Sequence, residues 1–214
     1  MSHVPIELTN STSSVIISKI TRDIEPDAGS MAYFYFDFND TRKQDCRALL
    51  SSLLVQLSNQ SDKFSDVLNG LYLEHPDGSQ PNIVSLLRCL KGMLTVAVAE
   101  SRPVYLVLDA LDECPKNSGV PSPREKVLEV VKELVELRLP NLRLCITSRP
   151  EFDIRTTLEP LATQQISLHD ESGQKQDIIY YVESVVRSDR KTVKWRDDDK
   201  KTVIEKLTEE ADGM

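Results

Sequence analysis

Two kinds of apolar pattern alternate along the chain, and the first kind predicts strands. It includes the aromatic-rich stretch AYFYFDF at 32–38, LRLCIT at 142–147 and QQISL at 164–168. A further stretch, VYLVL at 104–108, is a continuous apolar run. Such a run is typical of a strand buried on both faces of a parallel sheet. The pattern therefore predicts strands at these four places.

The second kind of pattern has apolar residues three or four positions apart, which predicts amphipathic helices. We expect helices at 43–58, 83–97 and 124–137, and a short helical piece at 151–158. Because helices join the predicted strands, the connections are crossovers and the sheet is expected to be mostly parallel. The chain is therefore expected to have an α/β fold.

Beyond the last predicted strand the pattern becomes wholly helical. One face of a first helix carries Ile178, Val182 and Val185, and one face of a second carries Val203, Ile204 and Leu207. We therefore divide the chain into an N-terminal remnant at 1–30, an α/β core at 31–168 and the beginning of a helical lid at 169–214. The chain stops inside the second helix, so we expect it to be a fragment of a larger unit.

The charge balance argues against nucleic acid as a partner. The 26 lysine and arginine residues stand against 34 aspartate and glutamate residues, a net charge of −8. Binding to a phosphate backbone requires a basic surface, so we expect no contact with nucleic acid. No apolar run approaches the roughly 20 residues that span a bilayer, and the start lacks the pattern of a signal peptide. We expect no membrane association and a cytoplasmic location.

The four cysteines do not suggest a metal site. Cys46, Cys89, Cys114 and Cys145 form no CxxC pair, and no histidine lies near two of them. A zinc site is therefore not expected. In a chain without a secretory leader, thiols spread in this way are expected to stay reduced.

Acidic residues follow the most apolar strand. The run at 104–108 places Asp109 at the carboxyl edge of the sheet, where ligands bind in open α/β folds. One carboxylate there can hold a hydrated Mg²⁺ that bridges nucleotide phosphates. Asp112 or Glu113 could orient or deprotonate an attacking water. The alternative is a buried strand that ends in a solvated acidic turn.

A second polar tip follows the strand at 142–147. It consists of Thr147, Ser148 and Arg149, and the arginine could sense a γ-phosphate or stabilise charge that develops on it. The alternative is a strand end with an ordinary exposed arginine.

Four stretches carry a resemblance to a known family: FYFDFNDTRKQDCRALLSSLLVQL at 34–57, PVYLVLDALDEC at 103–114, LRLCITSRPEFDI at 142–154 and QISLHDESGQKQDIIYYV at 165–182. In this order they resemble the NACHT domain of the STAND class of P-loop NTPases. The resemblance is greatest to fungal NOD-like receptor proteins with a nephrocystin-like N-terminal region. It implies a P-loop NTPase-like, three-layer α/β/α sandwich with a mostly parallel sheet, followed by the start of a helical extension.

The resemblance also implies roles for residues, cofactors and partners. DALDEC is the NACHT form of the Walker B motif. It would make Asp109 the Mg²⁺ ligand, Asp112 and Glu113 the hydrolytic acids and Arg149 the sensor, with ATP or GTP as the nucleotide. Proteins of this family switch by nucleotide exchange from a closed monomer to a signalling oligomer, and many carry repeat domains downstream. The implied partners are a second copy or full-length NACHT relatives.

The phosphate loop of that family is missing from this sequence. No G-x-x-x-x-G-K-S/T motif occurs, and the equivalent position reads NSTSSVIISKI at 10–20. On this alignment Ser13 replaces the lysine and Ser14 supplies the Mg²⁺-binding hydroxyl. Without the glycines and the lysine, weak nucleotide binding or none is expected. The alternative is an N-terminus unrelated to any phosphate loop.

Three functions follow, in order of preference. The first is a NACHT-type regulatory domain that is deficient in nucleotide binding. The second is an interaction module that docks on full-length relatives. The third is an active ATP or GTP hydrolase that uses an unconventional phosphate loop at 11–14.

Overall fold

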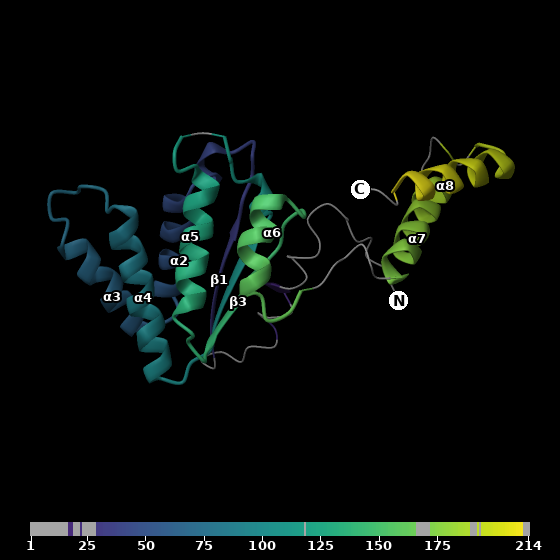
Figure 1. Ribbon diagram of the computed structural model, residues 1–214. Helices are drawn as coiled ribbons and strands as arrows, with labels where there is room; N and C mark the ends of the chain where they lie inside the picture. The colour runs from purple at the N-terminus through teal and green to yellow at the C-terminus, as the bar shows by residue number, and fades with distance from the viewer. Residues whose placement is uncertain are drawn as a thin grey trace. The chain divides into compact units, whose positions relative to one another are not determined.

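The computed structural model describes residues 29–117, 119–165, 172–188 and 194–211, together with residues 17, 18, 22 and 192. The chain forms two compact units, Met1–Ala162 and Thr163–Met214. The first unit contains the sheet and the second contains two helices (Figure 1).

The sheet of the first unit has three parallel strands in the order β1-β2-β3. They are β1 (Ser30–Tyr35), β2 (Val104–Asp109) and β3 (Leu142–Ile146). Val104 of the central strand pairs with Ser30 on one side and with Leu142 on the other. Val104, Leu106, Val107 and Leu108 are all buried, as the continuous apolar run predicts. The predicted α/β fold with a parallel sheet is confirmed.

From residue 29 on, the helices of the first unit are α2 (Cys46–Ser58), α3 (Asp62–Leu73), α4 (Ile83–Ala99), α5 (Pro123–Glu136) and α6 (Phe152–Leu158). Short 3₁₀ turns lie at η1 (Thr41–Lys43), η2 (Leu111–Glu113) and η3 (Glu159–Leu161). Helix α2 packs on β1 and contacts α4 and α5, and α3 packs against α2 and α4. Figure 1 shows α3 and α4 on the outer side of α2.

Capping side chains decide where the helices begin. The Asp45 carboxylate accepts from the backbone N–H of Ala48, so α2 begins at Cys46 rather than at the predicted residue 43. Asn82 caps α4 in the same way through Ser85. Ser122 and Glu125 form a reciprocal capping box at the start of α5. The predicted helices at 43–58, 83–97 and 124–137 are confirmed to within three residues.

Two glutamine side chains, one in α2 and one just after it, close the outer edge of β1. Gln60 accepts from Met31 N (2.9 Å) and donates to Met31 O (2.6 Å), and Gln56 accepts from Tyr33 N (3.1 Å) and donates to Tyr33 O (2.8 Å). Each amide therefore makes the two bonds that a neighbouring strand would make. These contacts protect an edge strand that would otherwise be open to pairing with another chain.

The second unit consists of α7 (Ser172–Ser188) packed against α8 (Asp197–Ala211). The two predicted helices are confirmed. On the predicted apolar faces Ile204 is buried, whereas Val185 and Leu207 are exposed, and Val186, which the prediction did not include, is buried.

The fourth predicted strand, at 164–168, is not found where the structure describes that segment. Gln164 and Gln165 lie outside any strand, and 166–168 lie outside the described residues. Among the described residues, none of the helices has the length and apolar character that crossing a bilayer requires.

Candidate functional site

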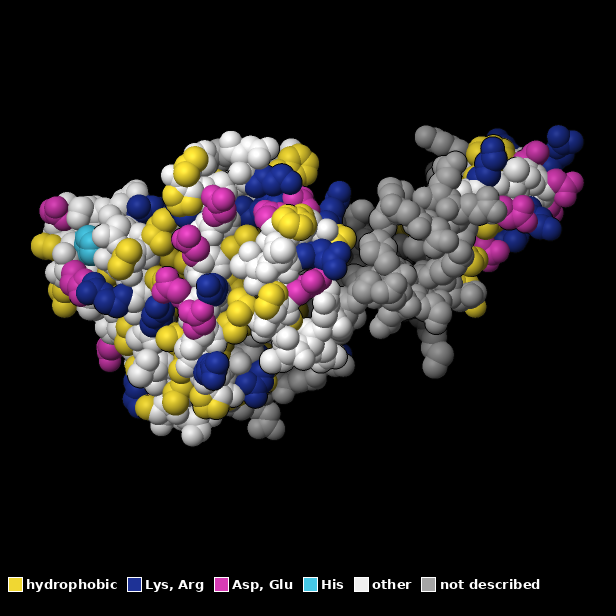
Figure 2. Space-filling view, in the orientation of Figure 1, with side chains coloured by type: hydrophobic (Ala, Val, Ile, Leu, Met, Phe, Trp, Pro, Cys, Tyr) yellow, Lys and Arg dark blue, Asp and Glu magenta, His cyan; other side chains and the backbone are white. Residues whose placement is uncertain are grey.

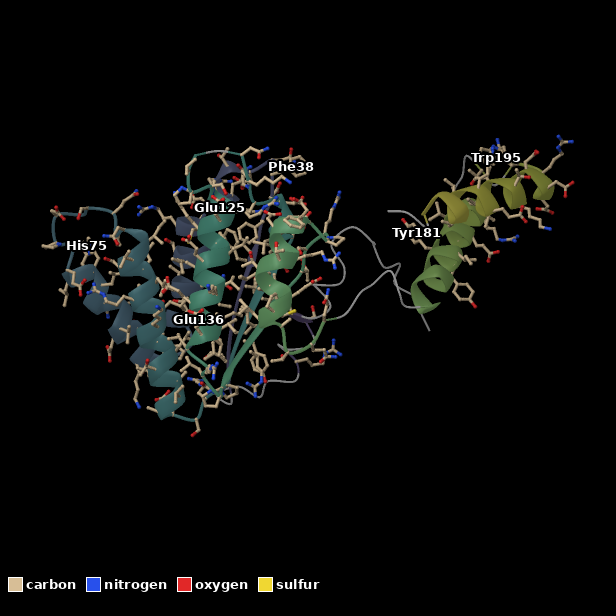
Figure 3. The ribbon with its side chains drawn as sticks, in the orientation of Figure 1. Phe38, His75, Glu125, Glu136, Tyr181 and Trp195 are labelled. Carbon is tan, nitrogen blue, oxygen red and sulfur yellow. The ribbon has the colours of Figure 1, made fainter. Side chains whose placement is uncertain are left out.

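All three strands point the same way, so the segments that follow them meet at one edge of the sheet. Asp109 ends β2, Arg149 follows β3 by three residues, and Phe38 follows β1 by three residues. The structure brings together at this edge the four described residues that the sequence predicts as a site: Asp109, Asp112, Glu113 and Arg149. Figure 3 shows Phe38 and Glu125 at this end of the first unit, and Glu136 at the far end of α5.

A left-handed residue turns the chain sharply after β2. Ala110 has φ 55° and ψ 47°, and Glu113 N donates to Ala110 O (2.9 Å) in the turn that begins η2. Leu111 is fully buried and its N–H donates to Thr147 O (3.0 Å). The turn thus anchors one apolar side chain in the core and places the acidic pair Asp112 and Glu113 at its rim.

Asp109 is tied to the segment after β3. The Thr147 hydroxyl donates to Asp109 Oδ1, and the backbone N–H of Ala110 donates to Thr147 Oγ1 (3.1 Å). Thr147 N also donates to Leu108 O (2.9 Å). Thr147 therefore fixes the carboxylate that the sequence predicts as the Mg²⁺ ligand.

Asp112 holds Arg149. Asp112 Oδ1 accepts from Arg149 N (3.0 Å), and Asp112 Oδ2 lies 3.5 Å from Arg149 Nε. The Asp112 side chain is 12% exposed, whereas that of Arg149 is 85% exposed. A predicted hydrolytic acid and the predicted sensor thus form an ion pair with each other.

Glu113 connects the turn to the end of β1. Its Oε2 accepts from the backbone N–H of Phe38 (3.2 Å), and the Phe38 ring is 66% exposed. The segments after all three strands are thereby linked through the turn after β2.

Arg124 is a residue of this region that the site prediction did not include. It is buried near the start of α5 and contacts both the turn after β2 and the start of α6. A signal for it exists in the sequence, because position 124 lies three and four residues before the apolar positions Val127 and Leu128. A charged residue on the buried face of a helix needs partners, and this one has them.

Hydrogen bonds hold the pKa of Glu151 below its ordinary value. The Lys116 ammonium makes the larger contribution, at 2.9 Å from Glu151 Oε2, and the Arg124 guanidinium makes the second, at 2.6 Å. Glu151 is therefore charged at neutral pH and neutralises cations on two neighbouring segments.

The donor set at this edge fits Mg²⁺ in kind but not as a complete cage. Carboxylate and hydroxyl oxygens are the ligands that Mg²⁺ prefers, and one or two of them suffice when phosphates supply others. In the part of the chain that the structure describes, no group of three or more His, Cys, Asp and Glu residues could hold a metal by itself. Asp109 would therefore need phosphate and water oxygens beside it.

The site offers few free cations to bind the phosphates of a nucleotide among the described residues. Among the basic side chains near this edge, Arg149 is paired with Asp112, and both Lys116 and Arg124 are paired with Glu151. Ser13 and Ser14, the residues predicted to contact the nucleotide, lie outside the described residues, so their role stays a prediction.

Replacing Ala110 should show how strained the turn is. A Cβ in the left-handed region costs roughly 1–2 kcal/mol, so Ala110→Gly is expected to raise the free energy of unfolding by about 0.5–1 kcal/mol. Ala110→Val is expected to lower it by about 1–3 kcal/mol. Urea unfolding followed by circular dichroism measures both. In the control Ala99→Gly, at the end of α4, the same substitution should be destabilising. A loss of stability in Ala110→Gly would contradict the strained turn.

Comparison with known proteins places most of the first unit in one group. A family model described as "Nephrocystin 3, N-terminal" matches residues 11–149. The match covers more than half of the 214 residues and includes all three strands and the four clustered site residues. Searches of curated proteins and of solved structures found no significant match.

Proposed function

Because the chain belongs to the nephrocystin-3 N-terminal family, we propose that it is a regulatory domain of the NACHT type that binds nucleotide only weakly. One observation carries the proposal: Asp109, Asp112, Glu113 and Arg149 cluster at the carboxyl edge of a parallel sheet. That edge is where α/β folds bind nucleotides. The four residues belong to the two motifs that resemble the NACHT family.

In this proposal each residue has a separate task. Asp109, oriented by Thr147, would hold the metal ion. Bound Mg²⁺ with a nucleotide would neutralise charge on the phosphate oxygens. Arg149 would leave Asp112 for a phosphate, which its exposure permits, and the ion pair with Asp112 would be lost. Glu113 would stay bound to Phe38 N, so a movement of the turn after β2 would also move the segment after β1.

The resting contacts favour regulation over turnover. Arg149 has a protein partner in Asp112, Glu113 has one in Phe38 N, and Asp109 has one in Thr147. A phosphate must displace Asp112 from Arg149 without the help of a glycine-rich loop or its lysine, which the sequence lacks. We therefore expect dissociation constants weaker than about 1 mM for ATP and GTP, which is less than about 4 kcal/mol of binding free energy.

A nucleotide titration of the full chain tests the proposal. Amide chemical shifts are recorded up to about 10 mM Mg-ATP or Mg-GTP, a concentration chosen to reveal binding near the millimolar range. Shifts are expected at 109–113 and 147–149 and should be lost in Asp109→Asn. They should persist in the control Asp66→Asn, which changes an exposed side chain of α3. No shift in the wild-type chain would contradict nucleotide response. Micromolar binding would contradict the expected deficiency and favour a hydrolase with an unconventional loop at 11–14.

The interaction module remains the second candidate, and exposed apolar side chains favour it. Phe38, Val120 and Phe152 are all largely exposed on segments near the carboxyl edge of the sheet, and Trp195 and Leu207 are exposed in the second unit. Figure 2 shows apolar side chains among acidic and basic ones over the starts of α5 and α6. Exposed apolar surface of this kind is common at sites of protein association. The predicted partners, a second copy or a full-length relative, would be detected by light scattering.

A further inference from the structure

Arg124 is the one charged side chain that is buried in the described part of the chain. It is 3% exposed, and the other buried polar residues there are Ser30 and Ser122. Burying a guanidinium is unfavourable unless its donors are satisfied by well-placed acceptors. The acceptors of Arg124 therefore show which segments of the chain this side chain holds together.

Two donors of Arg124 reach the turn after β2. Nε donates to Cys114 O (2.8 Å), and Nη2 donates to Asp112 O. Both acceptors are backbone carbonyls of the turn that carries the acidic pair. The guanidinium therefore fixes the path of the main chain on either side of Glu113.

The third donor reaches the start of α6. Nη1 donates to Glu151 Oε2 (2.6 Å) and lies 3.3 Å from Asp153 Oδ2. Glu151 follows Arg149 by two residues, and its N–H donates to Arg149 O (2.8 Å). One side chain thus contacts both segments that Asp112 and Arg149 bring together.

We propose that Arg124 is the positioning residue of this site: it holds the turn after β2 against the start of α6, so that the Asp112 carboxylate meets Arg149. The inference rests on the proposed function for its significance, but the contact that it predicts exists without nucleotide. The planar fork of arginine can serve two directions at once, which the single ammonium of lysine cannot. Arg124→Lys therefore keeps the charge and removes the bridge.

Lys116 provides a matched control. It is the other cation on Glu151, at 2.9 Å, and it is 52% exposed. Lys116→Met removes a positive charge beside the same carboxylate but leaves both carbonyl contacts of Arg124 in place. The two variants therefore separate positioning of the turn from neutralisation of Glu151.

Hydrogen exchange of the Arg149 amide, which donates to Asp112 Oδ1, tests the proposal in the full chain without nucleotide. Arg124→Lys is expected to raise its exchange rate at least about tenfold, since hydrogen bonds to charged groups contribute on this scale. Lys116→Met should leave the rate within about twofold. The amides of Leu106 and Leu108 in β2 report global opening.

Two results would overturn the positioning role. One is an Arg149 amide that accelerates only in step with Leu106 and Leu108, which a purely structural role would produce. The other is an increase in the exchange rate of the Arg149 amide in Lys116→Met as large as that in Arg124→Lys. If Arg124→Lys does not fold, Glu151→Gln keeps the arginine and weakens its contact with α6, and an unchanged Arg149 amide in that variant would also contradict the proposal. Nucleotide titration of the wild-type chain tests the proposed function separately.

Discussion

Replacing Leu111 with alanine is expected to lower the free energy of unfolding by about 2–5 kcal/mol, the range for a buried leucine whose cavity only partly closes. Leu111 is fully buried and belongs to the hydrophobic core of the first unit. It is also the residue between Ala110 and Asp112, so the same side chain that fills the core anchors the acidic turn. Urea unfolding with the midpoint and slope compared between variants measures the loss.

Leu73→Ala is the matched control for this prediction. Leu73 ends α3 and is 75% exposed, so the same truncation there is expected to change the stability by less than about 0.5 kcal/mol. A loss below about 1 kcal/mol in Leu111→Ala would show that the turn is not anchored in the core. The contact between Glu113 and Phe38 N should loosen in the same variant, because the turn loses its buried anchor.

The sequence predicts the sheet well because burial on two faces leaves a strong pattern. VYLVL at 104–108 became β2 with one further residue, Asp109, since no polar residue interrupts the run. The predicted clustering of Asp109, Asp112, Glu113 and Arg149 follows from the topology alone, because parallel strands end at the same edge. Their chemical roles do not follow from topology and remain predictions.

The boundaries of β1 were less predictable. The strand runs from Ser30 to Tyr35, whereas the aromatic stretch suggested 32–38. Ser30 belongs to the strand although it is polar, because its backbone N–H pairs with Pro103 O (2.8 Å). At the other end the Asp37 side chain accepts from Asn39 N (2.8 Å) and turns the chain away. Tertiary pairing and local turn chemistry together place the start of the strand two residues and its end three residues earlier than predicted.

Helix α3 was not predicted although its sequence carries a helical signal. Phe64, Val67, Leu68 and Leu71 are spaced by three and four residues, which is the pattern of an amphipathic helix. Phe64 and Leu71 are buried, and Val67 and Leu68 pack against the core. This face packs against α2 and α4, so the helix could have been found from the sequence.

The contacts within the site depend on conformation more than on residue type. Arg149 meets Asp112 only because Ala110 adopts a left-handed conformation and because Thr147 and Arg124 fix the segments on either side. The sequence shows which charged groups are available at the edge, but it does not show that they pair with each other. That pairing is what favours a regulatory domain over an enzyme in the proposed function.

Alkaline pH is expected to destabilise the chain through two buried thiols near this site. Burial raises the pKa of Cys46 from 9.0 to about 12, and it raises that of Cys114 to about 12 as well. Between pH 9 and 12 the unfolded chain has released these protons and the folded chain still holds them. The unfolded state then binds fewer protons, so stability falls as pH rises, by about 1.4 kcal/mol per pH unit for each thiol. Below pH 9 both states keep the protons and this contribution disappears.

Comparison of the wild-type chain with the double variant Cys46→Ala and Cys114→Ala isolates this effect. Between pH 8 and pH 10 the wild-type chain is expected to lose about 3 kcal/mol more than the double variant. The double variant is less stable at pH 8 because packing is lost, so the change with pH is the quantity to compare. Met93→Ala, which removes a buried side chain without a titrating group, should keep the wild-type pH dependence. Parallel pH profiles for the wild-type chain and the double variant would show that Cys46 and Cys114 ionise in the folded chain as readily as in the unfolded one.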